Sequence, residues 1–361
     1  MTSLESGITK LLGRLSIDPS IRQSAVAQEL NVTRSAVNQL WKKLEIEHNL
    51  RILSNLDYKS IGFHHIYGWV STRSDIDSIT KFQHWIKNNQ YIVRVLKSQL
   101  TSKMDNRVLF EALVPEGNDL RLFIDTLQRF RKKPYSLDVI YDFTTNVANH
   151  FNFGYFNGTS WAFQTDFRFE ASIDAAKQYA DILPVGQSRR QGPLGRASIQ
   201  DVIIAATIES DYFSTSSHIS NILYRVGLNL PSERTLRRRI NKFRSTIAQP
   251  YISLDHIGLE RIIGITIDAS AQSNISKLMR SQAVTLPKVR VLTGSDTIVL
   301  ILGLPPQTDL FHISNAMTHI VKAPSEMCTF IAEQVRDTRW LENIIHKMTV
   351  RRRDKKTRPT R

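Results

Sequence analysis

The chain has 361 residues, of which 41% are hydrophobic and 22% are charged, a composition typical of a globular protein with more than one core. Its 48 Lys and Arg residues against 33 Asp and Glu residues give a net charge of +15 with His neutral, which favours polyanions as partners. Cys328 is the single cysteine, so an internal disulfide is excluded, and no apolar run approaches the roughly 18–20 residues that span a bilayer. With an N-terminus unlike a signal peptide, these features predict a cytoplasmic, nucleoid-associated protein without membrane contact.

Residues 1–55 predict a helix-turn-helix domain. Apolar residues recur at spacings of three and four within residues 8–15 and 21–30, which indicates two amphipathic helices. Asn31 tolerates the left-handed backbone of a tight turn, Val32 is expected to plug the core beneath that turn, and Thr33 suits the N-cap of a third helix.

The third helix, residues 33–44, has two different faces. Val37, Trp41 and Leu44 recur at spacings of four and three and must face the core. The other face carries hydroxyls, amides and cations, which are the groups that read base edges in the major groove and neutralise phosphates. The predicted DNA-binding residues of this helix are Thr33, Arg34, Ser35, Asn38, Gln39, Lys42 and Lys43. The alternative is a three-helix packing module whose polar face meets only water.

Residues 56–145 predict a domain of a different kind. Their periodicity indicates the order strand, helix, strand, strand, helix, strand, which is the ferredoxin-like arrangement with both helices on one face of an antiparallel sheet. His64 and His65 are adjacent in the first strand and must point to opposite faces, so they cannot bind one metal together. The chain has no zinc-site spacing, phosphate loop, nucleophile elbow or dinucleotide fingerprint, so we predict no metal, no cofactor and no enzymatic activity.

Residues 146–198 separate the two halves of the chain. The first part of this segment is rich in aromatic residues and glycine and predicts an extra hairpin or a strand extension, and residues 172–183 predict a connecting helix. Residues 186–196 contain three glycines, one proline and three arginines, which is typical of an exposed flexible linker.

The second half repeats the organisation of the first. Residues 199–252 predict a second helix-turn-helix domain, residues 253–340 a second βαββαβ domain, and residues 341–361 a basic tail of the kind that binds nucleic acid. The string Val-Arg-Val-Leu at 93–96 recurs 196 positions later at 289–292, and Ile-Gly at 61–62 recurs at the same displacement. Two landmarks at one displacement, with matching element orders around them, indicate a duplication.

The second recognition helix is predicted at residues 232–243, where Leu236, Ile240 and Phe243 take the apolar positions. Its outward residues are mostly arginine, and only Glu233 offsets them in the first turns. Like charges on one helix face repel each other unless an anion neutralises them, and the phosphate backbone of DNA is the anion we expect. The predicted DNA-binding residues here are Ser232, Arg234, Arg237, Arg238, Asn241 and Lys242.

A winged helix-turn-helix followed by "LDYKSIGF" and a βαββαβ domain resembles the Lrp/AsnC family of prokaryotic transcription regulators. The segment "VRVLTGSDTIVLIL", residues 289–302, is similar to that family's central hairpin, with Thr293, Gly294 and Asp296 in its turn. The resemblance implies an α+β fold of two winged helix-turn-helix domains that bind double-stranded DNA. Each is followed by a ferredoxin-like, or RAM-like, domain that mediates assembly and in some members binds an amino-acid effector.

The chain departs from the family pattern in two respects. The family has one copy per chain and dimerises through its sheets, whereas this chain holds two, so we expect an intramolecular pseudo-dimer or a homo-oligomer through the βαββαβ sheets. A longer polar loop replaces the glycine turn in the first copy, so no effector site is transferred there. In the second copy, Gly294 and Asp296 either form only a tight turn or line a ligand pocket.

We therefore predict a sequence-specific transcription regulator with two different recognition helices, of which the arginine-rich second helix is the less selective. Two alternatives remain open. One is an architectural nucleoid protein that binds DNA without sequence preference. The other is an Lrp-like haem-pathway decarboxylase that does not bind DNA and that needs a His and Arg set around a tetrapyrrole pocket. RNA is disfavoured, because the strands lack the Gly-aromatic signature of an RNA-recognition motif.

Overall fold

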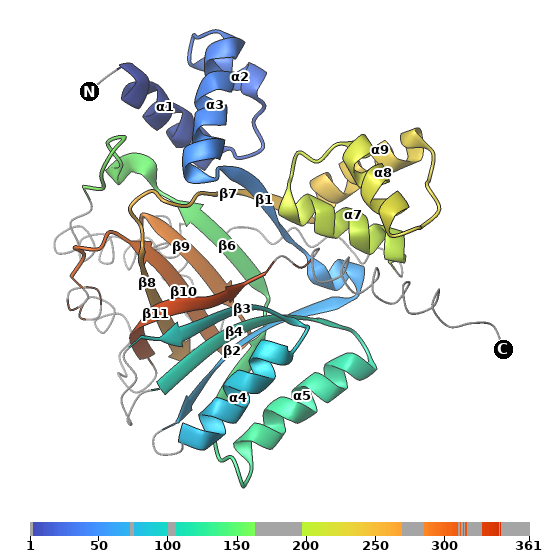
Figure 1. The fold of residues 1–361 in the computed structure, drawn as a ribbon, viewed down its shortest axis with the longest axis vertical. Coiled ribbons are helices and arrows are strands. Elements are labelled where there is room, and N and C mark those ends of the chain that lie inside the picture. The colour runs from blue at the N-terminus through green and yellow to red at the C-terminus, as the bar shows by residue number, and fades with distance from the viewer. Residues whose placement is uncertain are drawn as a thin grey trace.

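The structure is a computed structural model, which describes residues 3–72, 76–99, 106–162, 197–268, 285–309, 311, 313, 315, 327–338 and 340. The predicted connecting helix, the linker up to residue 196 and the basic tail lie outside these residues, as do most of the two helices expected in the second βαββαβ domain. The fold is α+β, with a large antiparallel sheet between the two helix-turn-helix units and a further pair of helices (Figure 1). Among the described residues, no helix is both long enough and apolar enough to cross a membrane.

Each half begins with the three helices of a helix-turn-helix unit. The first unit contains α1 (Ser3–Ile17), α2 (Gln23–Glu29) and α3 (Arg34–His48), and the second contains α7 (Ile199–Ser210), α8 (Ser216–Arg225) and α9 (Glu233–Thr246). Thr33 and Ser232 are the N-caps of α3 and α9, where their hydroxyls accept backbone N–H bonds of 3.2 and 3.3 Å. Asn31 has the predicted left-handed conformation, with a φ of 53°.

The predicted role of Val32 is wrong, because 44% of this residue is exposed. The left-handed turn at Asn31 brings the backbone N–H of Val32 to the carbonyl of Ala27, 3.0 Å away, and the side chain then faces solvent. Val26 and Val37 are fully buried and fill the core of this unit.

The strands of both halves belong to one antiparallel sheet. The first half supplies β2 (Phe63–Thr72), β3 (Ile92–Ser98), β4 (Asn106–Pro115) and β5 (Asp138–Phe143), with α4 (Ile76–Asn88) and α5 (Asn118–Arg131) packed on one face. The second half supplies β8 (Arg261–Asp268), β9 (Lys288–Thr293), β10 (Thr297–Leu304) and β11 (Met327–Asp337). The strand order is β5-β2-β4-β3-β11-β8-β10-β9-β6, in which β6 (Asn146–Phe151) is the predicted strand extension. Each half keeps the ferredoxin-like order of its own four strands.

The last strand of each half pairs with a strand of the other half. β5 and β6 lie at opposite ends of the strand order, although only Thr144 and Thr145 separate them. β11 pairs with β8 through residues 327–332 and with β3 through residues 332–337. The two half-sheets therefore face each other across a shared core of Tyr67, Trp69, Leu96, Leu109, Leu292, Val299, Phe330 and Ala332.

The duplication predicted from the sequence is visible in equivalent conformations. Gly62 and Gly258, which are 196 positions apart, both have the left-handed φ that favours glycine, 81° and 78°. The two Val-Arg-Val-Leu strings lie in β3 and β9, which are the second strands of their own half-sheets.

Each helix-turn-helix unit packs against the opposite half of the chain. β1 (Arg51–Leu56) and β7 (Ala248–Ser253), the strands that follow the two units, pair with each other instead of forming a separate wing hairpin in each unit. The core of the first unit includes Ile252, Leu254 and Ile257 of the second half. The core of the second unit includes Leu56, Ile61 and Leu113 of the first half.

The close pairing of β2 with β5 leaves no room for a side chain at Gly68. A Cβ atom there would overlap the carbonyl oxygen of Ile140, whereas a Cβ on Gly13 in α1 would meet nothing within 4 Å. We expect Gly68→Ala to lower the free energy of unfolding by about 1–3 kcal/mol. We expect Gly13→Ala to raise it by up to about 1 kcal/mol, because alanine is the better helix former. Urea unfolding measures both changes, and a Gly68→Ala variant as stable as the wild type would contradict the β2–β5 pairing.

Candidate functional site

The predicted reading residues of α3 lie on its outward face. Thr33, Arg34, Ser35, Gln39 and Lys42 are exposed, Asn38 and Lys43 are half-buried, and the three predicted core residues of the helix are buried. Lys43 lies 3.8 Å from Glu47, while the Thr33 hydroxyl is engaged in capping the helix. The amide-bearing side of this helix is therefore not sealed against the rest of the chain.

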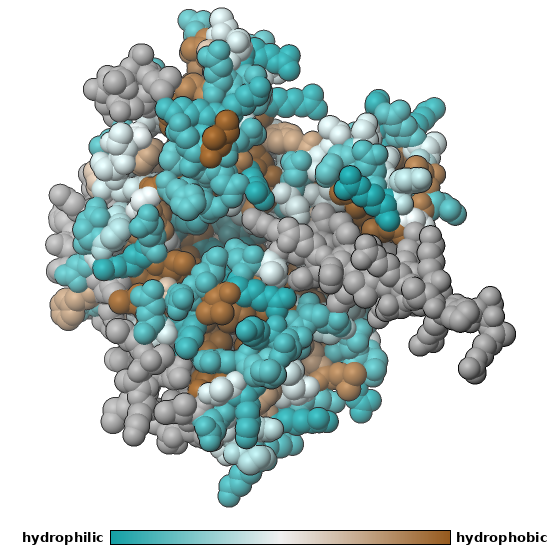
Figure 2. Space-filling view, in the orientation of Figure 1, coloured by the Kyte–Doolittle hydropathy of each residue, from teal (hydrophilic) through white to brown (hydrophobic). Residues whose placement is uncertain are grey.

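The predicted residues of α9 are also brought together on one exposed face. Ser232, Arg234, Arg237, Arg238, Asn241 and Lys242 are all exposed. The guanidinium of Arg237 donates to Glu233 Oε1 at 2.6 Å, and Arg239 turns away from this face to donate to Gln200 of α7 at 3.0 Å. In the space-filling view, hydrophilic residues cover most of the visible surface of both helix-turn-helix units (Figure 2).

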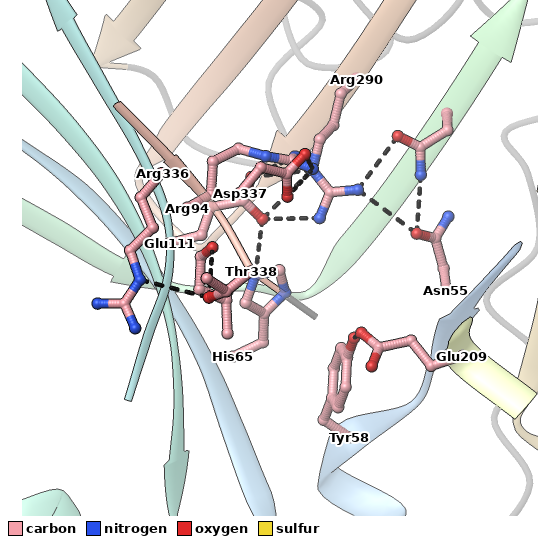
Figure 3. Close-up of polar contacts among 12 residues, drawn as sticks. Asn55, Tyr58, His65, Arg94, Glu111, Glu209, Arg290, Arg336, Asp337 and Thr338 are labelled. Carbon is pink, nitrogen blue, oxygen red and sulfur yellow. Dashed lines mark hydrogen bonds and ion pairs between the residues drawn. The ribbon is translucent and has the colours of Figure 1, made fainter. Parts of the chain in front are cut away.

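A second constellation lies inside the molecule where the two halves meet (Figure 3). At its centre is Glu111 of β4, which is 1% exposed. Arg94 of β3 donates to Glu111 Oε1 at 2.8 Å, and Arg290 of β9 donates to both carboxylate oxygens at 2.7 and 2.9 Å. These two arginines occupy the same place in the two Val-Arg-Val-Leu strings. A single carboxylate thus joins equivalent strands of the two halves.

His65 of β2 completes this cluster. Its Nε2 lies 3.0 Å from Glu111 Oε2 and its Nδ1 has no hydrogen-bond partner among the described residues. Because an ionised carboxylate only accepts hydrogen bonds, Nε2 carries the proton of the neutral ring. Burial lowers the pKa of His65 and outweighs the opposing effect of Glu111. Burial alone would raise the pKa of Glu111, but Arg290 and Arg94 outweigh it and hold that pKa well below its ordinary value.

A cavity of about 40 Å³ adjoins the cluster and is lined by residues of every unit, among them Asn55, Tyr58, Arg94, Glu209 and Arg290. This volume holds a water molecule or two, whereas sites for drug-sized ligands measure roughly 300–1,000 Å³. Among the residues that the structure describes, no three His, Cys, Asp or Glu side chains are grouped as a metal site would require.

The turn at Gly294 and Asp296 is filled by a side chain of the first half. Asp142 of β5 accepts hydrogen bonds from the backbone N–H groups of Asp296 and Thr297, at 2.8 and 3.2 Å. A Cβ atom on Gly294 would overlap this carboxylate. Of the two interpretations left open by the sequence, the geometry therefore favours a tight turn that is satisfied within the chain.

Neither the protein-family models nor the curated proteins contain a match to the sequence. The crystal structure of the siroheme decarboxylase NirDL matches with a TM-score of 0.51 and 10% identity, over 92% of this chain and 93% of that one. The chain has an Lrp/AsnC-like fold. The same enzyme in co-complex with an iron-uroporphyrin III analogue gives a TM-score of 0.49 at 10% identity, over 91% and 93% of the two chains. The crystal structure of PH0061 gives 0.27 at 18% identity, over 41% of this chain and 95% of that one. At these identities, the likeness concerns the fold alone.

The buried cluster was not predicted from the sequence, although one signal pointed to it. Arg94, Glu111 and Arg290 each have apolar neighbours on both sides in the sequence, a position where a charge requires a buried partner. The repeated Val-Arg-Val-Leu string was interpreted only as a sign of duplication. Its arginines also mark the place where the two copies meet.

Removing the central charge is expected to destabilise the chain strongly. In Glu111→Gln, two buried guanidiniums lose their shared counter-charge, and breaking a buried ion pair in this way costs about 3–5 kcal/mol. Glu116→Gln is the matched control, because Glu116 is exposed at the end of the same strand, and we expect a change within about 0.5 kcal/mol. Denaturant unfolding at neutral pH measures both variants, and equal stabilities would contradict the central role of Glu111.

Stability is expected to fall as the solution becomes acidic. His65 has a lowered pKa in the folded chain, so below its ordinary pKa of about 6.5 the unfolded chain binds the proton more readily, and stability is lost as pH falls. Glu111 adds a second loss below its ordinary pKa of about 4.5, towards its lower folded value. His65→Gln should flatten the loss between pH 6.5 and 5 without removing it, because burial also lowers the pKa values of His64 and His150. Thermal unfolding at a series of pH values across this range measures the change. If the stability of His65→Gln falls with pH as steeply as that of the wild type, the assignment to His65 is contradicted.

Proposed function

We propose that the chain is a sequence-specific, DNA-binding transcription regulator of the Lrp/AsnC type, which reads DNA with α3 and α9. The observation that supports this proposal best is the exposure of both predicted reading faces. Each face lies on a helix whose N-terminus is capped by a hydroxyl, the end from which a recognition helix contacts bases.

The two helices contribute differently to the proposed binding. Asn38 and Gln39 of α3 carry amides, which pair with adenine edges and discriminate between sequences. Arg234, Arg237 and Arg238 of α9 favour phosphate contacts, which release counterions and supply affinity for any sequence. The net charge of +15 adds long-range attraction to the same polyanion.

Paired substitutions test this division of roles. Site selection from a random duplex pool gives a cognate duplex, and a scrambled duplex serves as its comparison. Asn38→Ala/Gln39→Ala should weaken binding to the cognate duplex by about 1–3 kcal/mol for each base pair no longer read, and should leave the scrambled duplex nearly unaffected. Arg237→Ala/Arg238→Ala should weaken both duplexes and lower the salt slope by about 0.9 for each lost phosphate contact.

Arg121→Ala/Arg129→Ala is the control for loss of charge, since both residues are exposed on α5, on the opposite side of the sheet from the recognition helices (Figure 1). Equal weakening of both duplexes by the Asn/Gln pair would defeat base reading by α3. A steep salt slope without any preferred sequence would instead identify an architectural DNA-binding protein.

A second candidate function is decarboxylation in the haem pathway without DNA binding. The fold match with siroheme decarboxylase NirDL, over 92% of this chain, favours it. The buried cluster contains the His and two Arg residues that such chemistry was expected to need, namely His65, Arg94 and Arg290. However, Glu111 and Asp337 already pair with the two arginines, and the adjoining cavity of about 40 Å³ is far too small for a tetrapyrrole. The cluster does not fit this substrate, and no reaction step is derived from it.

Two direct measurements separate the candidates. An absorbance scan of the purified chain, alone and after mixing with siroheme, reveals tetrapyrrole binding, and chromatography of the mixture detects a decarboxylated product. The regulator proposal expects duplex binding without turnover. If the chain converts siroheme and binds no duplex from a random pool, the regulator proposal is overturned in favour of the enzyme.

A further inference from the structure

We infer that Asn55, Tyr58 and Glu209 fix the separation of the two recognition helices, so that one chain selects a pair of half-sites at a single spacing. This inference rests on the proposed function and specifies the DNA that the two helices bind together. It concerns residues that touch no DNA and that act by holding the two helix-turn-helix units in place.

The two recognition helices are connected by a short and stiff route. Only Asn49 and Leu50 separate α3 from β1, and only Ile247 separates α9 from β7. β1 and β7 then pair in an antiparallel register that runs from Arg51 opposite Ser253 to Leu56 opposite Ala248. The two helices therefore join opposite ends of one ribbon about 17 Å long, without a flexible linker between them.

The ribbon is attached to the large sheet through Asn55. Asn55 Oδ1 accepts a hydrogen bond from Asn149 of β6 at 2.7 Å, and Arg290 NH1 lies 3.5 Å from the same oxygen. Arg290 is itself held by Glu111, so the ribbon is tied to strands of both halves (Figure 3). A tilt of the ribbon relative to the sheet would break this half-buried network.

The same segment is also attached to the second helix-turn-helix unit. The hydroxyl of Tyr58 donates to Glu209 of α7 at 2.5 Å. Burial raises the pKa of Tyr58 well above its ordinary value, so the hydroxyl remains a donor. Nearby, Ser54 donates to the carbonyl of Ile208 at 3.0 Å, and the backbone N–H of Tyr212 donates to the carbonyl of Ile52 at 2.8 Å. The exit strand of the first unit is thus bonded directly to the second unit.

A rigid pair of recognition helices engages both half-sites only at the matching separation. When one half-site is bound, the second is reached at high effective concentration, and this advantage is lost if the geometry forbids simultaneous contact. An insertion of about 5 bp turns the second half-site to the opposite side of the duplex, because B-DNA repeats every 10–10.5 bp. Removing the hydrogen bonds of Asn55 or Tyr58 should therefore weaken the selectivity for half-site spacing more than it weakens the binding of either helix to a single half-site.

The test measures binding of full-length wild type, Asn55→Ala and Tyr58→Phe to three duplexes at one salt concentration. One duplex carries the selected paired site, one the same site with an insertion of about 5 bp, and one a single half-site. We expect the insertion to weaken wild-type binding by at least about tenfold and binding of each variant by less than about threefold, with single half-site affinities unchanged. Asn88→Ala is the control, because Asn88 is exposed on α4 and, among the described residues, its side chain bonds only to His84 of the same helix.

The possible outcomes are distinct. Folded variants that keep the wild-type spacing ratio would overturn the inference, with thermal unfolding as the check of folding. Asn55→Ala carries the test if Tyr58→Phe fails to fold, because Asn55 is only half-buried. A wild-type chain that tolerates the insertion would also overturn the inference while leaving DNA binding intact. Failure to select any duplex would instead overturn the proposed function itself.

Discussion

Two arginines, Arg94 and Arg290, share the buried carboxylate of Glu111, and the arrangement of the two halves depends on this shared charge. An ionised group is expensive to remove from water, so each arginine requires a carboxylate partner, and Glu111 requires at least one of them. The arginines are duplicates of each other, but the carboxylate is not. Glu111 pairs with Tyr67 in the first half-sheet, and the equivalent pair in the second is Leu302 with Ile263. The cluster therefore forms only between unlike halves, and the chain is not a simple doubling of one unit.

The charge cluster and the crossed packing of the helical units have a common geometric origin. Each half sends its last strand into the sheet of the other half, and each helix-turn-helix unit packs on residues of the other half. The ribbon of β1 and β7 runs between these units, next to the buried cluster. As a result, the exposed recognition helices and the charge cluster around Glu111 belong to one continuous framework. Asp142 adds a further link between the halves, since it fills the turn at Gly294.

Local patterns in the sequence predicted the elements well, for physical reasons that individual residues show. Val37, Trp41 and Leu44 had to share one face of a helix, and Thr33 could cap that helix without any knowledge of the fold. The ferredoxin-like order of the first half followed from periodicity in the same way. Local periodicity does not predict long-range pairing, because β1 pairs with β7 through residues that lie about 200 positions apart in the sequence. For the same reason, the partners of Arg94 and Arg290 were missed. The role of Val32 was predicted wrongly for a local reason, because the left-handed turn at Asn31 leaves its side chain exposed.

The exchange of strands also determines when the chain can fold. During synthesis from the N-terminus, β6 emerges with its neighbours from the first half, but its partner β9 is made only after about 140 further residues. Until then the first half-sheet has no cover for Tyr67 and Trp69, and its edge strand β3 waits for β11 at the far end of the chain. Contacts of such high sequence separation slow folding and expose unpaired edges. A first half still bound to the ribosome is therefore expected to have an incomplete core and an unpaired edge, because the two halves can pair fully only after β11 has been made.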